Sequence, residues 1–146
     1  MIKTLKLLAL TALLSTSAFA TITVEKAWIR PSTGPNGAMF MKLSNDAKTE
    51  TALKEVTVAG DFCNHTELHT HLHEDGVMKM REVESLKVPG QGYAELKPGA
   101  DHVMLMGLKR GLKQGDVIPV SLTLESGQTL TLDVTVQDCT ADGICH

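Results

Sequence analysis

The chain has 146 residues, of which 3% are aromatic, and its 14 basic and 17 acidic residues give a formal charge of −3 at pH 7. This length suits one domain with a single hydrophobic core. An acidic chain with few aromatic rings lacks the basic surface and the stacking side chains that nucleic acids require, so we expect no nucleic-acid partner.

Residues 1–20 have the pattern of a secretory signal peptide. Lys3 and Lys6 precede a short apolar run, and Ala18-Phe19-Ala20 supplies a small-x-small cleavage motif. The apolar run is too short, and too interrupted by Thr11 and Ser15, to span a membrane. We therefore expect an exported protein with no stable membrane span after cleavage.

The rest of the chain predicts an all-β domain over residues 21–137. Polar and apolar residues alternate with a period near two, and glycine, proline, asparagine and aspartate mark frequent turns. Ser126-Gly127 centres a predicted hairpin, Pro119 indicates an edge or a bulge near the start of its strand, and a helical turn is expected within residues 107–113. Many short strands favour a β-sandwich or barrel. The predicted strands span residues 22–29, 38–44, 50–58, 66–73, 77–83, 92–97, 102–107, 117–124 and 128–137.

Residues 138–146 lack this alternation and are predicted to form a C-terminal tail that carries Cys139, Cys145 and His146. The third cysteine is Cys63. In an exported protein we expect one disulfide and one remaining thiol. The spacing does not decide which two of the three cysteines pair.

The most specific chemical signal is a set of two imidazoles and two thioethers: His69, Met80, His102 and Met104. Hard cations such as calcium and magnesium prefer oxygen ligands, whereas the soft thioether sulfur selects Cu(I). A single methionine most often fills a gap in a core, which is how we interpret Met39 and Met41. We interpret Met78 and Met106 as packing residues beside the site, and Trp28 as a core residue.

Strand geometry permits these four residues to converge. Alternate residues of a strand share a face, so His69, His71 and His73 point to the same side of strand 66–73. A turn at Glu74-Asp75-Gly76 would fold the next strand back and bring Met80 close to His69. His102 and Met104 share a face of a third strand, which must pack or pair alongside.

At these residues the chain resembles the PCuAC-type periplasmic copper chaperones, over about residues 24–124. The family's metal pattern, His-x10-Met-x21-His-x-Met, fits His69, Met80, His102 and Met104 without a gap. Further shared motifs are Ala27-Trp28-Ile29-Arg30, Glu67-Leu68-His69, Gly76-Val77-Met78-Lys79-Met80-Arg81, Leu96-Lys97-Pro98-Gly99 and His102-Val103-Met104-Leu105-Met106-Gly107-Leu108.

The resemblance implies a cupredoxin-like Greek-key β-sandwich that binds Cu(I) near its surface in the periplasm. It further implies delivery of copper to an acceptor, such as a cytochrome oxidase subunit or an assembly factor, for the dinuclear copper centre. We expect a monomer that is not an enzyme.

Two features depart from the family pattern. Many members carry methionine where this chain has His71, and the tail ends in Cys145-His146. His71 and His73 are therefore candidate auxiliary ligands for a second metal ion, Cu(II) or Zn(II), and Cys145 and His146 are further candidates, since a thiolate could capture Cu(I). The alternatives are a solvated histidine cluster and a cysteine that forms a disulfide.

Competing functions fit the sequence less well. A blue-copper electron carrier needs a cysteine thiolate with two histidines, one of them well upstream; every histidine here follows Cys63, and Cys139 is followed only by His146. A thiol–disulfide oxidoreductase needs Cys-x-x-Cys, and the hydrolase motif Gly-x-Ser-x-Gly does not occur. A copper or zinc buffer without a dedicated acceptor uses the same ligands as a chaperone and stays open.

Overall fold

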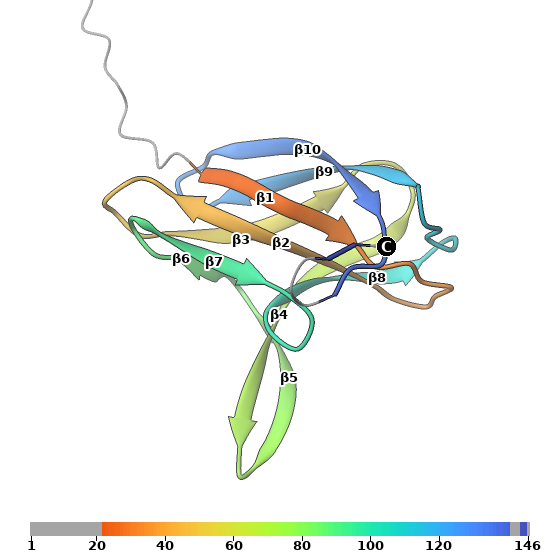
Figure 1. Cartoon of the computed structure of the whole chain (residues 1–146), viewed down its shortest axis with the longest axis horizontal. Coiled ribbons are helices and arrows are strands. Elements are labelled where there is room, and N and C mark those ends of the chain that lie inside the picture. Colours follow the sequence, from red (N-terminus) through yellow and green to blue (C-terminus); the bar gives the residue numbers. More distant parts are fainter. Residues whose placement is uncertain (1–21, 141–143, 146) are drawn as a thin grey trace, which may run out of the picture.

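The computed structural model describes residues 22–140 and 144–145, and the predicted signal peptide lies outside these ranges. Ten strands and no helix make up the described part of the chain (Figure 1). The strands are β1 (Ile22–Ile29), β2 (Gly37–Asn45), β3 (Thr51–Val58), β4 (Cys63–Glu74), β5 (Val77–Val83), β6 (Leu86–Val88), β7 (Gly92–Leu96), β8 (His102–Leu108), β9 (Val117–Leu124) and β10 (Thr129–Val136).

The all-β prediction is confirmed, and the bounds of β1, β5 and β9 are those predicted. The expected helical turn is wrong, because β8 continues to Leu108 and Leu112 instead forms an isolated bridge with Ser32. The sequence analysis missed β6, whose three residues are too few to display an alternating pattern. None of the described residues forms a helix long and apolar enough to cross a membrane.

Hydrogen-bonded neighbours follow the order β5-β4-β8-β2-β1-β10-β9-β3-β6, and β7 also pairs with β2. β1 joins the two layers of the sandwich, because it pairs antiparallel with β2 and then parallel with β10 at Trp28 and Ile29. A register shift lies between Glu25 and Trp28, where Lys26 has a φ of 52°, and beyond it Trp28 and Ile29 pair with β2 on one side and with β10 on the other.

The hydrophobic core lies between the two layers and confirms the interpretation of Met39 and Met41 as core residues. Their exposed fractions are 0% and 2%. Each strand of the sandwich contributes alternate side chains to this core, as the two-residue period requires. Fully buried members include Ile29, Leu43, Leu53, Val103, Leu105, Ile118, Val120, Leu122, Val134 and Val136.

Pro119 occupies a local edge within an internal strand. β9 pairs with β10 along its whole length, but its register with β3 ends at the pair Val58–Val120. Pro119 therefore lies beyond the end of β3, so its lack of an N–H removes no hydrogen bond between the two strands. Its carbonyl accepts a hydrogen bond from the N–H of Ala59. The predicted hairpin at Ser126-Gly127 joins β9 to β10, and Gly127 has a φ of 91°.

A hairpin of β4 and β5 extends beyond the body of the sandwich (Figure 1). Asp75 and Gly76 form its two-residue turn with φ values of 51° and 75°, the positive values of a type I′ turn that suits the twist of paired strands. The base of the hairpin continues into the sandwich, because β4 also pairs with β8.

A disulfide between Cys139 and Cys145 closes a loop within the tail, and Cys139 anchors this loop to the sandwich by packing. Cys139 is 7% exposed and packs with Trp28 and Phe40, whose ring centroids are 4.6 Å apart. Trp28 is itself buried in this cluster, which agrees with its interpretation as a core residue. Cys63 is the free, half-buried cysteine.

Candidate metal centre

The register of β5, β4 and β8 brings the predicted ligands to one face of three adjacent strands. His69 faces His102 across the β4–β8 pair, and Met104 lies two residues further along β8, opposite Glu67. On the other side of β4, Met80 faces His71. His69 therefore occupies the middle position, with Met104 and Met80 each displaced by two residue pairs, in opposite directions along β4.

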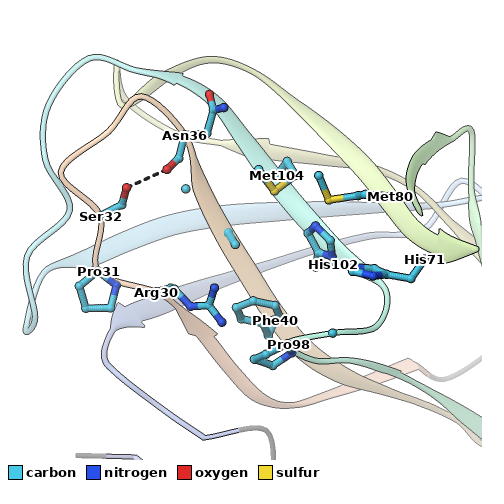
Figure 2. Close-up of a pocket in the computed structure, with 13 residues that line it drawn as sticks. Arg30, Pro31, Ser32, Asn36, Phe40, His71, Met80, Pro98, His102 and Met104 are labelled. Carbon is cyan, nitrogen blue, oxygen red and sulfur yellow. Dashed lines mark hydrogen bonds between the residues drawn. The ribbon is translucent and has the colours of Figure 1, made fainter. Parts of the chain in front are cut away.

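Three of the four predicted ligands line a common surface pocket of about 360 Å³: Met80, His102 and Met104. Figure 2 shows their side chains gathered at one end of this pocket, beside His71. His69 does not line the pocket, but its ring centroid lies 5.6 Å from that of His102. The ring of His71 is at a similar 5.5 Å from His102.

His102 is held in the tautomer that a metal ligand needs. Its Nδ1 lies 2.8 Å from the carbonyl oxygen of Ala100, and because a carbonyl only accepts, Nδ1 must donate the proton. Nε2 then keeps a free lone pair. The side chain is 6% exposed, and this burial lowers its pKa below the ordinary value for histidine, although the Ala100 hydrogen bond opposes the shift.

His69 is held in the opposite tautomer. Its Nε2 lies 2.9 Å from Oε1 of Glu67, which accepts a hydrogen bond when ionised. Hydrogen bonds from His69 and from His65 lower the pKa of Glu67, so this carboxylate is ionised at neutral pH. Nδ1 of His69 is buried and has no hydrogen-bond partner, which leaves a free lone pair inside the protein.

The two sulfur side chains differ in exposure. Met80 lies on the projecting hairpin and is 52% exposed, whereas Met104 is half-buried on β8. Val77 and Met78 are also exposed near the tip of the hairpin. A metal bound here would therefore be reachable from solvent on the hairpin side.

The candidate auxiliary ligands do not form one group. His71 lines the pocket, and its buried Nδ1 has no partner. His73 lies two residues further along β4, paired with Met78 and exposed. Cys145 is bonded to Cys139, so its sulfur is not available as a thiolate ligand, and His146 lies outside the described residues.

The aromatic wall of the pocket and the two glutamates beside His69 were not predicted from the sequence. Phe40 lines the pocket, with its ring centroid 6.1 Å from that of His102 and the Arg30 guanidinium 5.1 Å from its centre. Glu67 and Glu82 flank His69, one on the same strand and the other opposite it on β5. The two-residue period places Glu67 on the face of His69, although it does not show which side chain Glu67 contacts.

A pH effect on stability follows from the burial of His102. An exposed histidine in the unfolded chain takes up a proton near pH 6.5, whereas folded His102 resists protonation until a lower pH. The stability of the metal-free protein is therefore complete above about pH 6.5 and falls as the pH drops below that value, by at most about 1.4 kcal/mol per pH unit for one group.

Urea unfolding of the metal-free protein at several pH values between 7.5 and 5 measures this slope. We expect His102→Gln, which removes the titrating group, to have a shallower slope than the unmodified protein. Equal slopes would show that His102 does not contribute to the pH dependence.

The fold and the clustered histidines and methionines define the class of protein. Over residues 22–136 the chain matches the family model described as "Putative lipoprotein LpqE-like". This protein belongs to the LpqE-like family. A relative in Leifsonia xyli subsp. xyli, named "Putative lipoprotein Lxx21020", is 31% identical over 118 residues, which cover 80% of this chain and 70% of the relative.

Solved structures of PCuAC domains share the fold. The structure of CuI-DR1885 from Deinococcus radiodurans is 30% identical with a TM-score of 0.62, covering 83% of this chain and 82% of that one. The copper-bound PCuAC domain from PmoF2 is 20% identical with a TM-score of 0.64, covering 79% and 91%. These similarities confirm the predicted resemblance to PCuAC-type proteins and the cupredoxin-like sandwich.

Proposed function

We propose that this protein is an exported metallochaperone that binds Cu(I) through His69, Met80, His102 and Met104. The register of β5, β4 and β8 is the observation that carries the proposal, because it centres His69 among the other three residues. The similarity to a protein solved with Cu(I), DR1885, supports the choice of metal.

The two imidazoles would bind through different nitrogens. His102 offers Nε2 because the Ala100 carbonyl holds its Nδ1 proton, and His69 offers Nδ1 because Glu67 holds its Nε2 proton. The exposed Met80 side chain is free to adjust the position of its sulfur, since methionine has three flexible side-chain torsions. The resulting site has two nitrogen and two sulfur ligands, a donor set suited to Cu(I).

Exposure of the sulfur side suits transfer to another protein. An acceptor can approach Met80 on the hairpin and replace the thioethers one at a time, while the buried His102 releases the metal last. We propose cytochrome oxidase, in particular its dinuclear copper centre, as the destination and the periplasm as the location. The family model and the Leifsonia relative are both named as putative lipoproteins, and this name is consistent with an envelope protein.

A transfer experiment distinguishes delivery from storage. The Cu(I)-loaded protein is mixed with a copper-free, soluble copper domain of cytochrome oxidase, and the metal on each partner is measured after separation. We expect copper to move to the oxidase domain within minutes to hours. Copper retained by this protein at equilibrium would favour a copper buffer instead.

A matched pair of variants tests which histidine of β4 completes the site. We expect His69→Gln to lower the Cu(I) affinity by at least about tenfold, as loss of a metal-binding group does, and His71→Gln to change it by less than about threefold. Competition with a coloured Cu(I) chelator measures both values. A larger loss in His71→Gln would assign the fourth ligand to His71, which already lines the pocket.

A further inference from the structure

The pocket beside the proposed copper ligands extends well beyond them. Its other part is lined by Arg30, Asn36 and Phe40, and Figure 2 shows Arg30 and Phe40 side by side, away from Met80. The whole pocket has a volume of about 360 Å³, which lies in the range of sites for small molecules. A single metal ion fills only a small part of such a volume, so the pocket has room for a further ligand.

Arg30 brings an unpaired positive charge to this pocket. Its guanidinium carbon lies 5.1 Å from the centre of the Phe40 ring, and its backbone N–H donates to the carbonyl of Ala38. Among the described residues no carboxylate forms an ion pair with Arg30. Stacking on a ring uses the face of the guanidinium, so the N–H groups along its edge stay free to bind a ligand.

The rest of the pocket also favours an anion. None of the described residues that line it is acidic, although the chain has 17 acidic and 14 basic residues. Oδ1 of Asn36 accepts a hydrogen bond from the N–H of Gly107 at 3.1 Å, which leaves the two N–H groups of the Asn36 amide as donors. Cu(I) held by two neutral imidazoles and two thioethers would add a further positive charge.

Phe40 lies between Arg30 and the proposed copper site (Figure 2). Its ring centroid is 6.1 Å from that of His102, so the Arg30 guanidinium is no farther from the His102 ring than this distance and the 5.1 Å stacking distance combined. A short molecule with its carboxylate on Arg30 can therefore reach the copper site with its other end. Sulfur is a donor that Cu(I) prefers, and the exposed Met80 is the ligand that it would replace.

We infer that Arg30 binds the carboxylate of a small sulfur-bearing acid and thereby places the sulfur beside the copper site. A planar guanidinium can donate two parallel hydrogen bonds to one carboxylate, which fixes the orientation of the acid. The sulfur contact rests on the proposed Cu(I) site, whereas the carboxylate site does not depend on the metal. When the acid replaces Met80, one Cu–S bond forms as another breaks, and the copper remains Cu(I).

An NMR chemical-shift titration of the metal-free protein tests the carboxylate site. The probes are methylthiopropionate, a thioether acid, and methylthiopropanol, the neutral alcohol of the same chain length. We expect the acid to bind at least about fivefold more tightly than the alcohol, because only the acid can pair with Arg30. Arg30→Gln, at an exposed position, should remove this preference without unfolding the protein.

Arg110→Gln is the matched control for Arg30→Gln. The Arg110 guanidinium also stacks on a phenylalanine ring, 4.0 Å from the centre of Phe62, and Arg110 does not line the pocket. This variant should keep the preference for the acid. Equal binding of acid and alcohol by the unmodified protein, or an unchanged preference in Arg30→Gln, would overturn the carboxylate site.

The same titration of the Cu(I)-loaded protein tests the sulfur contact. We expect Cu(I) to tighten binding of methylthiopropionate at least about threefold, through its charge and its bond to sulfur. Butyrate, an acid without sulfur, should gain less, and equal gains for the two acids would overturn the sulfur contact. Failure of the protein to bind Cu(I) would contradict the proposed function, whereas loss of the acid preference in the metal-free protein would contradict this inference alone.

Discussion

Replacement of both Met80 and Met104 by leucine is expected to lower the affinity for Cu(I) by at least about a hundredfold, about tenfold or more for each ligand lost. Leucine keeps the volume and the apolar character of methionine and removes the sulfur. Exchange of the two residues costs less than about 1.5 kcal/mol even in a core, and Met80 is exposed. The fold should therefore persist while the soft ligands disappear.

Met106→Leu is the control for this double variant. Met106 lies on the same strand and face as Met104, two residues further along and opposite His65, and it is not among the residues that line the pocket. Competition with a Cu(I) chelator should give Met106→Leu the affinity of the unmodified protein. An equal loss in Met106→Leu, or no loss in the double variant, would contradict the assignment of the sulfur ligands.

Leu105→Ala is expected to lower the free energy of unfolding by about 2–5 kcal/mol, the cost of a cavity in a well-packed core. Leu105 is fully buried between the layers, while its neighbour Met104 points to the opposite face. For a domain of this size, a loss at the upper end of that range would remove a large share of the total stability.

Urea unfolding of the metal-free protein measures the effect of Leu105→Ala, and Met104→Leu serves as its partner variant. We expect Leu105→Ala to lower the free energy of unfolding and Met104→Leu to lower the affinity for Cu(I), because the two neighbouring side chains point to opposite faces of β8. A stability loss from Leu105→Ala below about 1 kcal/mol would show that the core tolerates the cavity.

Alternation of polar and apolar residues was sufficient to predict most of the sandwich. It gave the bounds of β5 because the turn at Asp75-Gly76 and the run of exposed residues on that strand both appear in the sequence. It placed the start of β4 three residues late, since His65 and Asn64 are polar and resemble a loop. β6 was missed for lack of length, and the sheet order could not be read from spacing at all.

The candidate site was predictable as a set of residue types and less so as a geometry. Spacing identified Met80, His102 and Met104, which the structure brings to one pocket. It could not tell that Glu67 holds the ring of His69, because that depends on the rotation of a side chain within its own strand. Pairing of His71 with Met80 depends on the hairpin register, which the two-residue turn fixes.

The Cu K-edge X-ray absorption spectrum of the protein loaded with one equivalent of Cu(I) is the most direct test of the central claim. Four side chains on three neighbouring strands predict two nitrogen and two sulfur scatterers around the metal. A spectrum with nitrogen and oxygen neighbours alone, or one unaltered in the Met80→Leu/Met104→Leu variant, would show that copper binds elsewhere on the chain.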